Sequence, residues 1–101
     1  MTRLVVTRRA KQDFDDIDQY LTQRGGARVA LRYAEKFRKQ LITIVDFGSG
    51  TRRPQLGRNV RFTVTSPYLL IYHCEHDAVT LMRILDGRRR ITRKLVAEGR
   101  D

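Results

Sequence analysis

Three strand-like runs follow one another near the carboxyl end of the chain, and only short turns separate them. The runs span residues 60–65, 68–74 and 79–85. The first alternates apolar and polar residues, whereas the second is apolar on both faces, as in a central strand. Parallel neighbours need a crossover of about a dozen residues or more, which these turns cannot supply. The sequence therefore predicts an antiparallel meander.

Two helical patterns precede the meander. In the first, apolar residues recur at steps of four, three and four (Ala10, Phe14, Ile17 and Leu21), and Thr7 stands where it can cap the helix. Gly25-Gly26 interrupts the pattern. A second helix is predicted over residues 27–47, closed by Gly48, and a loop over residues 48–59. Residues before Thr7 alternate as a short strand.

The resulting order is strand, helix, helix and three strands, which predicts an α+β fold. We expect the helical hairpin to cover one face of a small antiparallel sheet, with the opening strand at the sheet edge. At 101 residues the chain has room for one modest core. We therefore expect one domain over residues 1–101.

The charge of the chain is strongly basic. Lys and Arg number 21 against 11 Asp and Glu, giving a net charge of +10 that favours acidic partners or nucleic acid. No apolar run approaches the roughly 18 residues that span a bilayer, so no membrane partner is expected. The one cysteine, Cys74, cannot form an internal disulfide, which fits a reducing cytoplasm.

Catalytic signatures are sparse. The two histidines, His73 and His76, would point to opposite faces of a strand, and the sequence has no zinc, nucleotide-binding or nucleophile-elbow motif. We expect neither a metal nor a cofactor. His73 could serve as a general acid or base on the central strand, but packing on the sheet is favoured.

The arginines carry the strongest functional signal. Arg83 interrupts the last apolar run, where an unpaired charge is costly, so it should face a polar partner, a groove or the sheet surface. Depending on strand register, Arg61 and Arg83 could share one surface beside Tyr72 or His73. The alternative is that both arginines extend from a sheet edge into solvent.

Charged residues also mark the first helix and the end of the chain. The first helix carries four aspartates, predicted to form a mainly solvated face (Asp13, Asp15, Asp16 and Asp18). Arg9 can pair with Asp13 one turn on. Arg88 to Lys94 is either a binding segment or an ordinary solvated tail.

These pieces together resemble a known family. Residues 8–20 are similar to the R-R-A-x-x-D-L-x-x-I-x-x-Y start of ParE toxins, within the ParE/RelE toxin superfamily. Further matching positions are Ala30, Tyr33-Ala34, Leu41 and Ile44, then Leu56-Gly57, Val60-Arg61, residues 68–72 and residues 79–89. The resemblance covers nearly the whole chain in the right order.

The resemblance implies the toxin of a bacterial type II toxin–antitoxin pair of the plasmid-stabilisation type. Such toxins are neutralised by a cognate antitoxin, here expected to be acidic and ParD-like, and ParE members are associated with inhibition of DNA gyrase. RelE members instead cleave messenger RNA in the ribosome. A RelE-like endoribonuclease is thus the alternative, with Arg61, His73 and Arg83 as its candidate residues. Residues 91–95 lack the Tyr or His of that branch, which favours a binding inhibitor.

Two sets of candidate binding residues follow. The expected target-binding residues are Arg83, Arg88, Arg89 and Arg90. The expected antitoxin-binding residues are Phe14, Tyr20, Tyr33 and Phe37, beside which a disordered antitoxin segment would fold across the helical hairpin and the sheet. A plain nucleic-acid-binding domain without toxicity is a third hypothesis.

Overall fold

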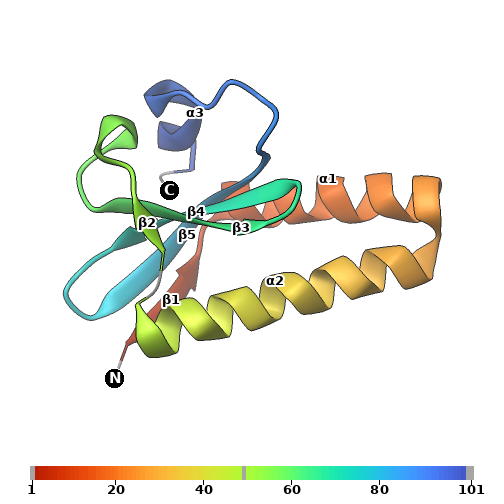
Figure 1. The fold of residues 1–101 in the computed structure, drawn as a ribbon, viewed down its shortest axis with the longest axis horizontal. Coiled ribbons are helices and arrows are strands. Elements are labelled where there is room, and N and C mark those ends of the chain that lie inside the picture. The colour runs from red at the N-terminus through yellow and green to blue at the C-terminus, as the bar shows by residue number, and fades with distance from the viewer. Residues whose placement is uncertain (1, 49, 100–101) are drawn as a thin grey trace.

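The computed structural model describes residues 2–48 and 50–99. In chain order the elements are β1 (Arg3–Val6), α1 (Arg8–Gly25), α2 (Ala27–Phe47), β2 (Thr51–Arg52), the short 3₁₀ helix η1 (Pro54–Leu56), β3 (Val60–Thr65), β4 (Tyr68–Cys74), β5 (Ala78–Asp86) and α3 (Arg93–Ala97). Figure 1 shows α1 and α2 as a long hairpin beside a twisted sheet, with α3 on the side of the sheet away from α2. The predicted α+β class is confirmed.

The helices of the hairpin begin and end at the predicted residues. Thr7 caps α1, and its hydroxyl oxygen accepts a hydrogen bond from the Ala10 amide at 3.1 Å. Gly48 ends α2 in the left-handed conformation, with φ of 60°, and its amide donates to the Ile44 carbonyl. Within the described residues, neither helix is long and apolar enough to cross a membrane.

The sheet has the order β1-β5-β4-β3-β2. The strands β3, β4 and β5 form the predicted antiparallel meander, and β1 lies at the sheet edge as expected. However, β1 runs parallel to β5, so the sheet is mixed rather than wholly antiparallel. No short turn joins β1 to β5, because the helical hairpin and the first strands of the meander lie between them in the sequence. So long a connection allows either a parallel or an antiparallel pairing.

Both faces of the sheet carry a core. Buried residues toward the helical hairpin are Ala10, Phe37, Tyr68, Leu70, Leu81 and Ile84. On the opposite face they are Leu56, Val60, Ile71, Met82, Leu85 and Val96. The second core depends on η1 and α3, neither of which was predicted: the first lies in the expected loop and the second in the expected tail.

The docking of α3 is tight at its end. Gly99 is buried, and a Cβ atom placed there would lie 2.2 Å from the Met82 carbonyl oxygen. Only a residue without a side chain lets the backbone approach β5 this closely. Gly99 thus brings the residues after Arg90 back onto the sheet.

Candidate partner-binding surfaces

Arg83, the unusual arginine of β5, lies in the interior. Its side chain is 1% exposed and that of Asp13 is 6% exposed. Nε and Nη2 of Arg83 donate to the two carboxylate oxygens of Asp13 at 2.7 and 2.9 Å, and Nη1 donates to the Leu95 carbonyl at 2.8 Å. This is a bidentate, charge-assisted pair that also holds α3.

Asp13 also accepts a backbone hydrogen bond at the edge of β5. The ladder between β1 and β5 ends at the pair Val6–Leu81, so the later part of β5 loses its strand neighbour. Thr7 continues the edge through its amide to the Leu81 carbonyl and its hydroxyl to the Met82 carbonyl, both at 3.1 Å. The Ile84 amide then donates to Asp13 at 3.0 Å. A side chain thereby replaces the missing strand.

The prediction that Asp13 belongs to a solvated face is therefore wrong. Asp13 stands three residues after Ala10 and one before Phe14, so it falls on the buried stripe of α1. That position was the available signal for a buried carboxylate. The predicted contact with Arg9 is present, with Arg9 Nε 3.9 Å from the Asp13 carboxylate.

The strand register decides whether Arg61 and Arg83 share a surface, which the sequence left open, and it separates them. Arg61 is opposite Tyr72, whereas Arg83 is opposite Ile71, and successive residues of a strand point to opposite faces. Arg61 Nη1 instead donates to the Gly48 carbonyl at 2.9 Å. Arg61 and Arg83 therefore lie on different faces of the sheet.

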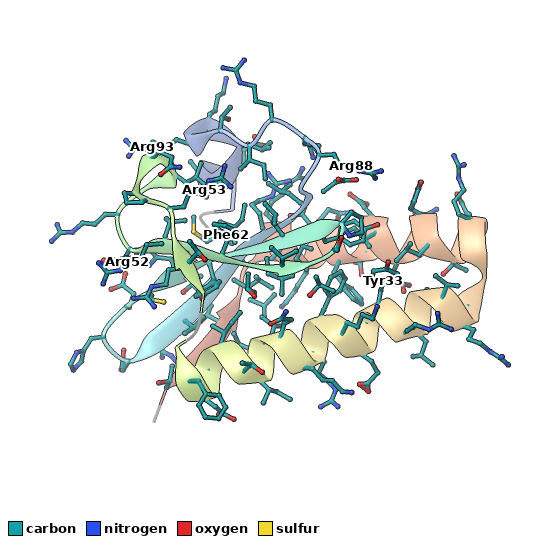
Figure 2. All side chains as sticks on the ribbon, viewed as in Figure 1. Tyr33, Arg52, Arg53, Phe62, Arg88 and Arg93 are labelled. Atoms are coloured by element: carbon teal, nitrogen blue, oxygen red, sulfur yellow. The ribbon has the colours of Figure 1, made fainter. Side chains whose placement is uncertain are left out.

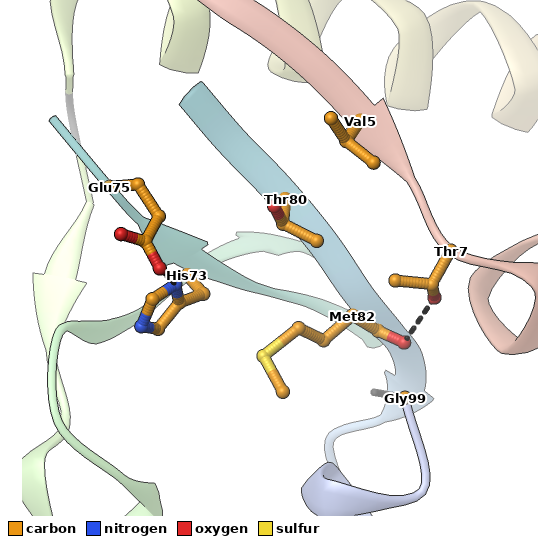
Figure 3. A pocket seen from close by; sticks show the side chains of 7 residues that line it. All are labelled: Val5, Thr7, His73, Glu75, Thr80, Met82 and Gly99. Carbon is orange, nitrogen blue, oxygen red and sulfur yellow. Dashed lines mark hydrogen bonds and ion pairs between the residues drawn. The ribbon is translucent and has the colours of Figure 1, made fainter. Parts of the chain in front are cut away.

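His73 lines a separate cavity of about 420 Å³, drawn in Figure 3. Its Nδ1 atom is 3.4 Å from the Glu75 carboxylate, so the imidazole has an orienting partner. The cavity wall comprises Val5, Thr7, His73, Glu75, Thr80, Met82 and Gly99. Neither Arg61 nor Arg83 belongs to it, so the three candidate nuclease residues do not converge on one site.

The arginines after β5 differ from Arg83. Arg88, Arg89 and Arg90 are all exposed. Arg88 donates from Nε and from its backbone amide to Asp86, in each case at 2.9 Å. The hydrogen bonds from the Arg88 side chain and backbone lower the pKa of Asp86 from 3.8 to about 2. The pair therefore presents Arg88 at the surface in a defined orientation.

An apolar groove of about 450 Å³ lies between the two long helices. Its wall consists of Val6, Ala10, Phe14, Ala34, Phe37, Leu41, Leu81 and Ile84, with Lys11, Asp15 and Arg38 among the lining residues. Phe14 and Phe37 pack edge to face there, with ring centroids 6.3 Å apart. Two of the four expected antitoxin-binding residues thus share one groove.

The two tyrosines of that set lie elsewhere. Tyr33 packs edge to face on Tyr68, with ring centroids 5.8 Å apart. Tyr20 is 50% exposed and lines a cavity of about 290 Å³ together with Tyr68, Asp86 and Arg88. Burial raises the pKa of Tyr68, and the nearby Asp86 carboxylate raises it further. Tyr20 therefore adjoins the arginine segment rather than the apolar groove.

Comparisons with known proteins agree with this architecture. The structure is similar to a chain of the chromosomal ParDE TA system from P. aeruginosa, with a TM-score of 0.73 and 24% sequence identity over 85% of this chain and 96% of that chain. At this identity the likeness establishes the fold. No match was found among curated proteins. The family model for the ParE toxin of type II toxin-antitoxin system, parDE, matches residues 4–91. The chain therefore belongs to the ParE toxin family of type II toxin–antitoxin systems.

Proposed function

We propose that this toxin stops bacterial growth by binding DNA gyrase in the cytoplasm, and that a cognate acidic, ParD-like antitoxin neutralises it by docking on the helical hairpin. The groove between α1 and α2 supports the proposed docking of the antitoxin, because it leaves apolar surface of Phe14 and its neighbours accessible. The target part rests on the family and on the exposed arginine segment (Arg88, Arg89 and Arg90).

The groove suits an amphipathic segment. Its floor is apolar, and two of the three charged residues along it, Lys11 and Arg38, are basic. An acidic antitoxin segment can place apolar side chains on the floor and carboxylates against those cations. The net charge of +10 adds long-range attraction, which accelerates association more than it strengthens the final complex.

The arginine segment suits a binding inhibitor. Arg88 is 77% exposed, and Asp86 holds its guanidinium by a local hydrogen-bonded pair. Arg83 is left out of the proposed target surface, because Asp13 and Leu95 already accept hydrogen bonds from its three side-chain nitrogens. The proposed target-binding residues are therefore Arg88, Arg89 and Arg90.

The position of Tyr20 supplies a route to neutralisation. Tyr20 and Arg88 line the same small cavity. An antitoxin segment that leaves the groove and covers Tyr20 would therefore also cover Arg88. Neutralisation would then be direct occlusion of the target-binding surface.

One variant and one control test the docking of the antitoxin. Replacing Phe14 and Tyr20 by Ala should weaken antitoxin binding by more than about thirtyfold, as expected for interface hot spots. The control Leu31→Ala removes an apolar side chain that is 68% exposed, outside the groove, and should leave antitoxin binding unchanged. Equal weakening by both would contradict docking in the groove.

The target is tested separately. Purified toxin should inhibit supercoiling by gyrase, and replacing Arg88, Arg89 and Arg90 by Ala should remove that inhibition while antitoxin binding persists. Unimpaired supercoiling together with cleavage of ribosome-bound messenger RNA would contradict the gyrase assignment.

A further inference from the structure

A third cavity, at the edge of the sheet formed by β2 and β3, is lined by arginines. It has a volume of about 240 Å³, and its wall includes Arg52, Arg58 and Arg61. The remaining lining residues, Pro54, Asn59, Val60 and Cys74, carry no formal charge. Three arginines among the residues that line so small a space make it a candidate site for an anion.

The strand pairing accentuates this charge. Arg52 of β2 is directly opposite Arg61 of β3, and like charges in that position destabilise a sheet. Among residues 2–48 and 50–99, no carboxylate lies within 4.0 Å of Arg52, Arg58 or Arg61. The sequence itself has no Asp or Glu between Asp46 and Glu75. A bound anion would relieve the repulsion that the chain does not neutralise here.

One of the three arginines is held in place. Arg61 is half-buried, and its Nη1 atom donates to the Gly48 carbonyl at 2.9 Å. Within residues 2–48 and 50–99, the other donors of its guanidinium have no side-chain or backbone acceptor and can serve a ligand. Arg52 and Arg58 are exposed and can close on an anion from solvent.

An aromatic side chain lies at the same edge of the sheet. The Arg53 guanidinium lies over the Phe62 ring, 5.3 Å from its centroid, and Arg93 Nη2 donates to the Pro54 carbonyl at 3.4 Å. Figure 2 shows Arg52, Arg53, Phe62 and Arg93 at one end of the molecule, far from Arg88. Phe62 follows Arg61 in β3 and therefore points to the opposite face of the sheet, where it packs on the second core, so Arg53 and Arg93 carry the positive charge around this edge.

We propose that the cavity of Arg52, Arg58 and Arg61 binds a backbone phosphate of a single-stranded nucleic acid. Arg53 and Arg93 extend the positive surface around this edge of the sheet, where the strand would run. This site is separate from both the helical groove and the Arg88 segment, and it does not depend on the identity of the growth-inhibition target.

The test uses the full chain and a short fluorescein-labelled single-stranded DNA, with binding followed by anisotropy over a range of salt concentrations. Replacing Arg52 and Arg58 by Gln should weaken binding about tenfold or more. The slope of log K against log salt should become shallower by up to about 0.7, since one phosphate contact contributes about 0.7 for a single strand. Arg61 is retained in this variant, so its contact with Gly48 is preserved.

A matched control removes the same charge elsewhere. Arg28 and Arg32 are exposed on α2, and replacing both by Gln should change the affinity and the slope much less. Equal losses in the two double variants would show that net charge is responsible, and would overturn the proposed site. Absence of binding by the parent chain would overturn it as well.

Two competitors identify the chemistry of the ligand. Inorganic phosphate should displace the DNA more effectively than chloride at equal ionic strength, and this difference should disappear in the Arg52 and Arg58 double variant. Polyglutamate should compete poorly. Competition by polyglutamate as strong as that of unlabelled DNA would assign the surface to an acidic protein partner and would contradict the nucleic-acid proposal.

Discussion

Two aspartate–arginine pairs in this protein, one at Arg83 within β5 and one at the end of that strand, have opposite roles. Asp13 and Arg83 are 70 residues apart in sequence and almost wholly buried, whereas Asp86 and Arg88 are two residues apart and lie at the surface. Both pairs use the same two-pronged contact between guanidinium and carboxylate. The long-range pair joins α1, β5 and α3, while the local pair only orients a side chain that a partner can reach.

This comparison explains why Arg83 and Arg88 should respond differently to substitution. Breaking a buried pair leaves an uncompensated charge in the interior, which costs more than the pair itself contributes. An exposed pair competes with water and is screened by salt. Arg83 is therefore a folding residue, and Arg88 is available for function.

The largest expected effect comes from removing the buried carboxylate. Asp13→Ala leaves the Arg83 guanidinium and the Ile84 amide without their partner, and should lower the free energy of unfolding by about 3–5 kcal/mol. Urea unfolding of the purified chain measures this. Asp15→Ala, at an exposed position on the same helix, is the control and should stay within about 0.5 kcal/mol of the parent. Equal stability of the two variants would contradict the structural role of Asp13.

A double substitution sharpens the distinction between charge and packing. Replacing Asp13 by Leu and Arg83 by Met together removes both charges and keeps apolar volume at the site. The double variant should be more stable than the Asp13→Leu single variant by about 2 kcal/mol, because no buried charge is left unpaired. The measurement is a double-mutant cycle by urea unfolding. Additive losses would show that the pair acts as two independent residues.

A smaller effect is expected where α3 meets β5. Gly99→Ala places a Cβ atom against the Met82 backbone and should cost about 1–3 kcal/mol, in the range of overpacked interiors. It should also loosen the contact of Arg83 with Leu95, which faster amide exchange in residues 93–98 would report. Lys94→Ala, at an exposed position of α3, is the control and should leave stability and exchange nearly unchanged. A stable Gly99→Ala variant would contradict the close approach.

Much of this fold was predictable because its signals are local. The helix bounds follow from Thr7, Gly26 and Gly48, and the meander follows from two short turns. The direction of β1 and the docking of α3 depend on contacts between distant segments, which local periodicity does not encode. The same limit explains why Asp13 was placed on the wrong face: its partner Arg83 is 70 residues away.

The candidate sites divide in the same way. Phe14 and Phe37, two of the predicted antitoxin-binding residues, line the groove between α1 and α2 because helical spacing puts both on inward faces. Strand register decides whether Arg61 and Arg83 meet, and one irregularity between Ile71 and Tyr72 contributes to their separation. The cavity of Arg52, Arg58 and Arg61 depends on a two-residue strand inside an expected loop, too short to give a periodic signal.

The smallest expected effect belongs to the surface pair. The pKa of Asp86 is lowered from 3.8 to about 2, so the unfolded chain binds a proton here at a pH where the folded chain does not. The stabilising contribution of Asp86 is therefore present above about pH 4 and is lost as the pH falls toward 2. The difference in melting temperature between the parent and Asp86→Asn should be small at neutral pH, well below that for Asp13→Ala, and should shrink over this interval. Carboxyl NMR shifts of Asp86 in the folded chain should give the same titration. The weak, pH-dependent role of the surface pair would be contradicted if this difference in melting temperature did not change with pH. It would also be contradicted if the difference equalled the one caused by Asp13→Ala.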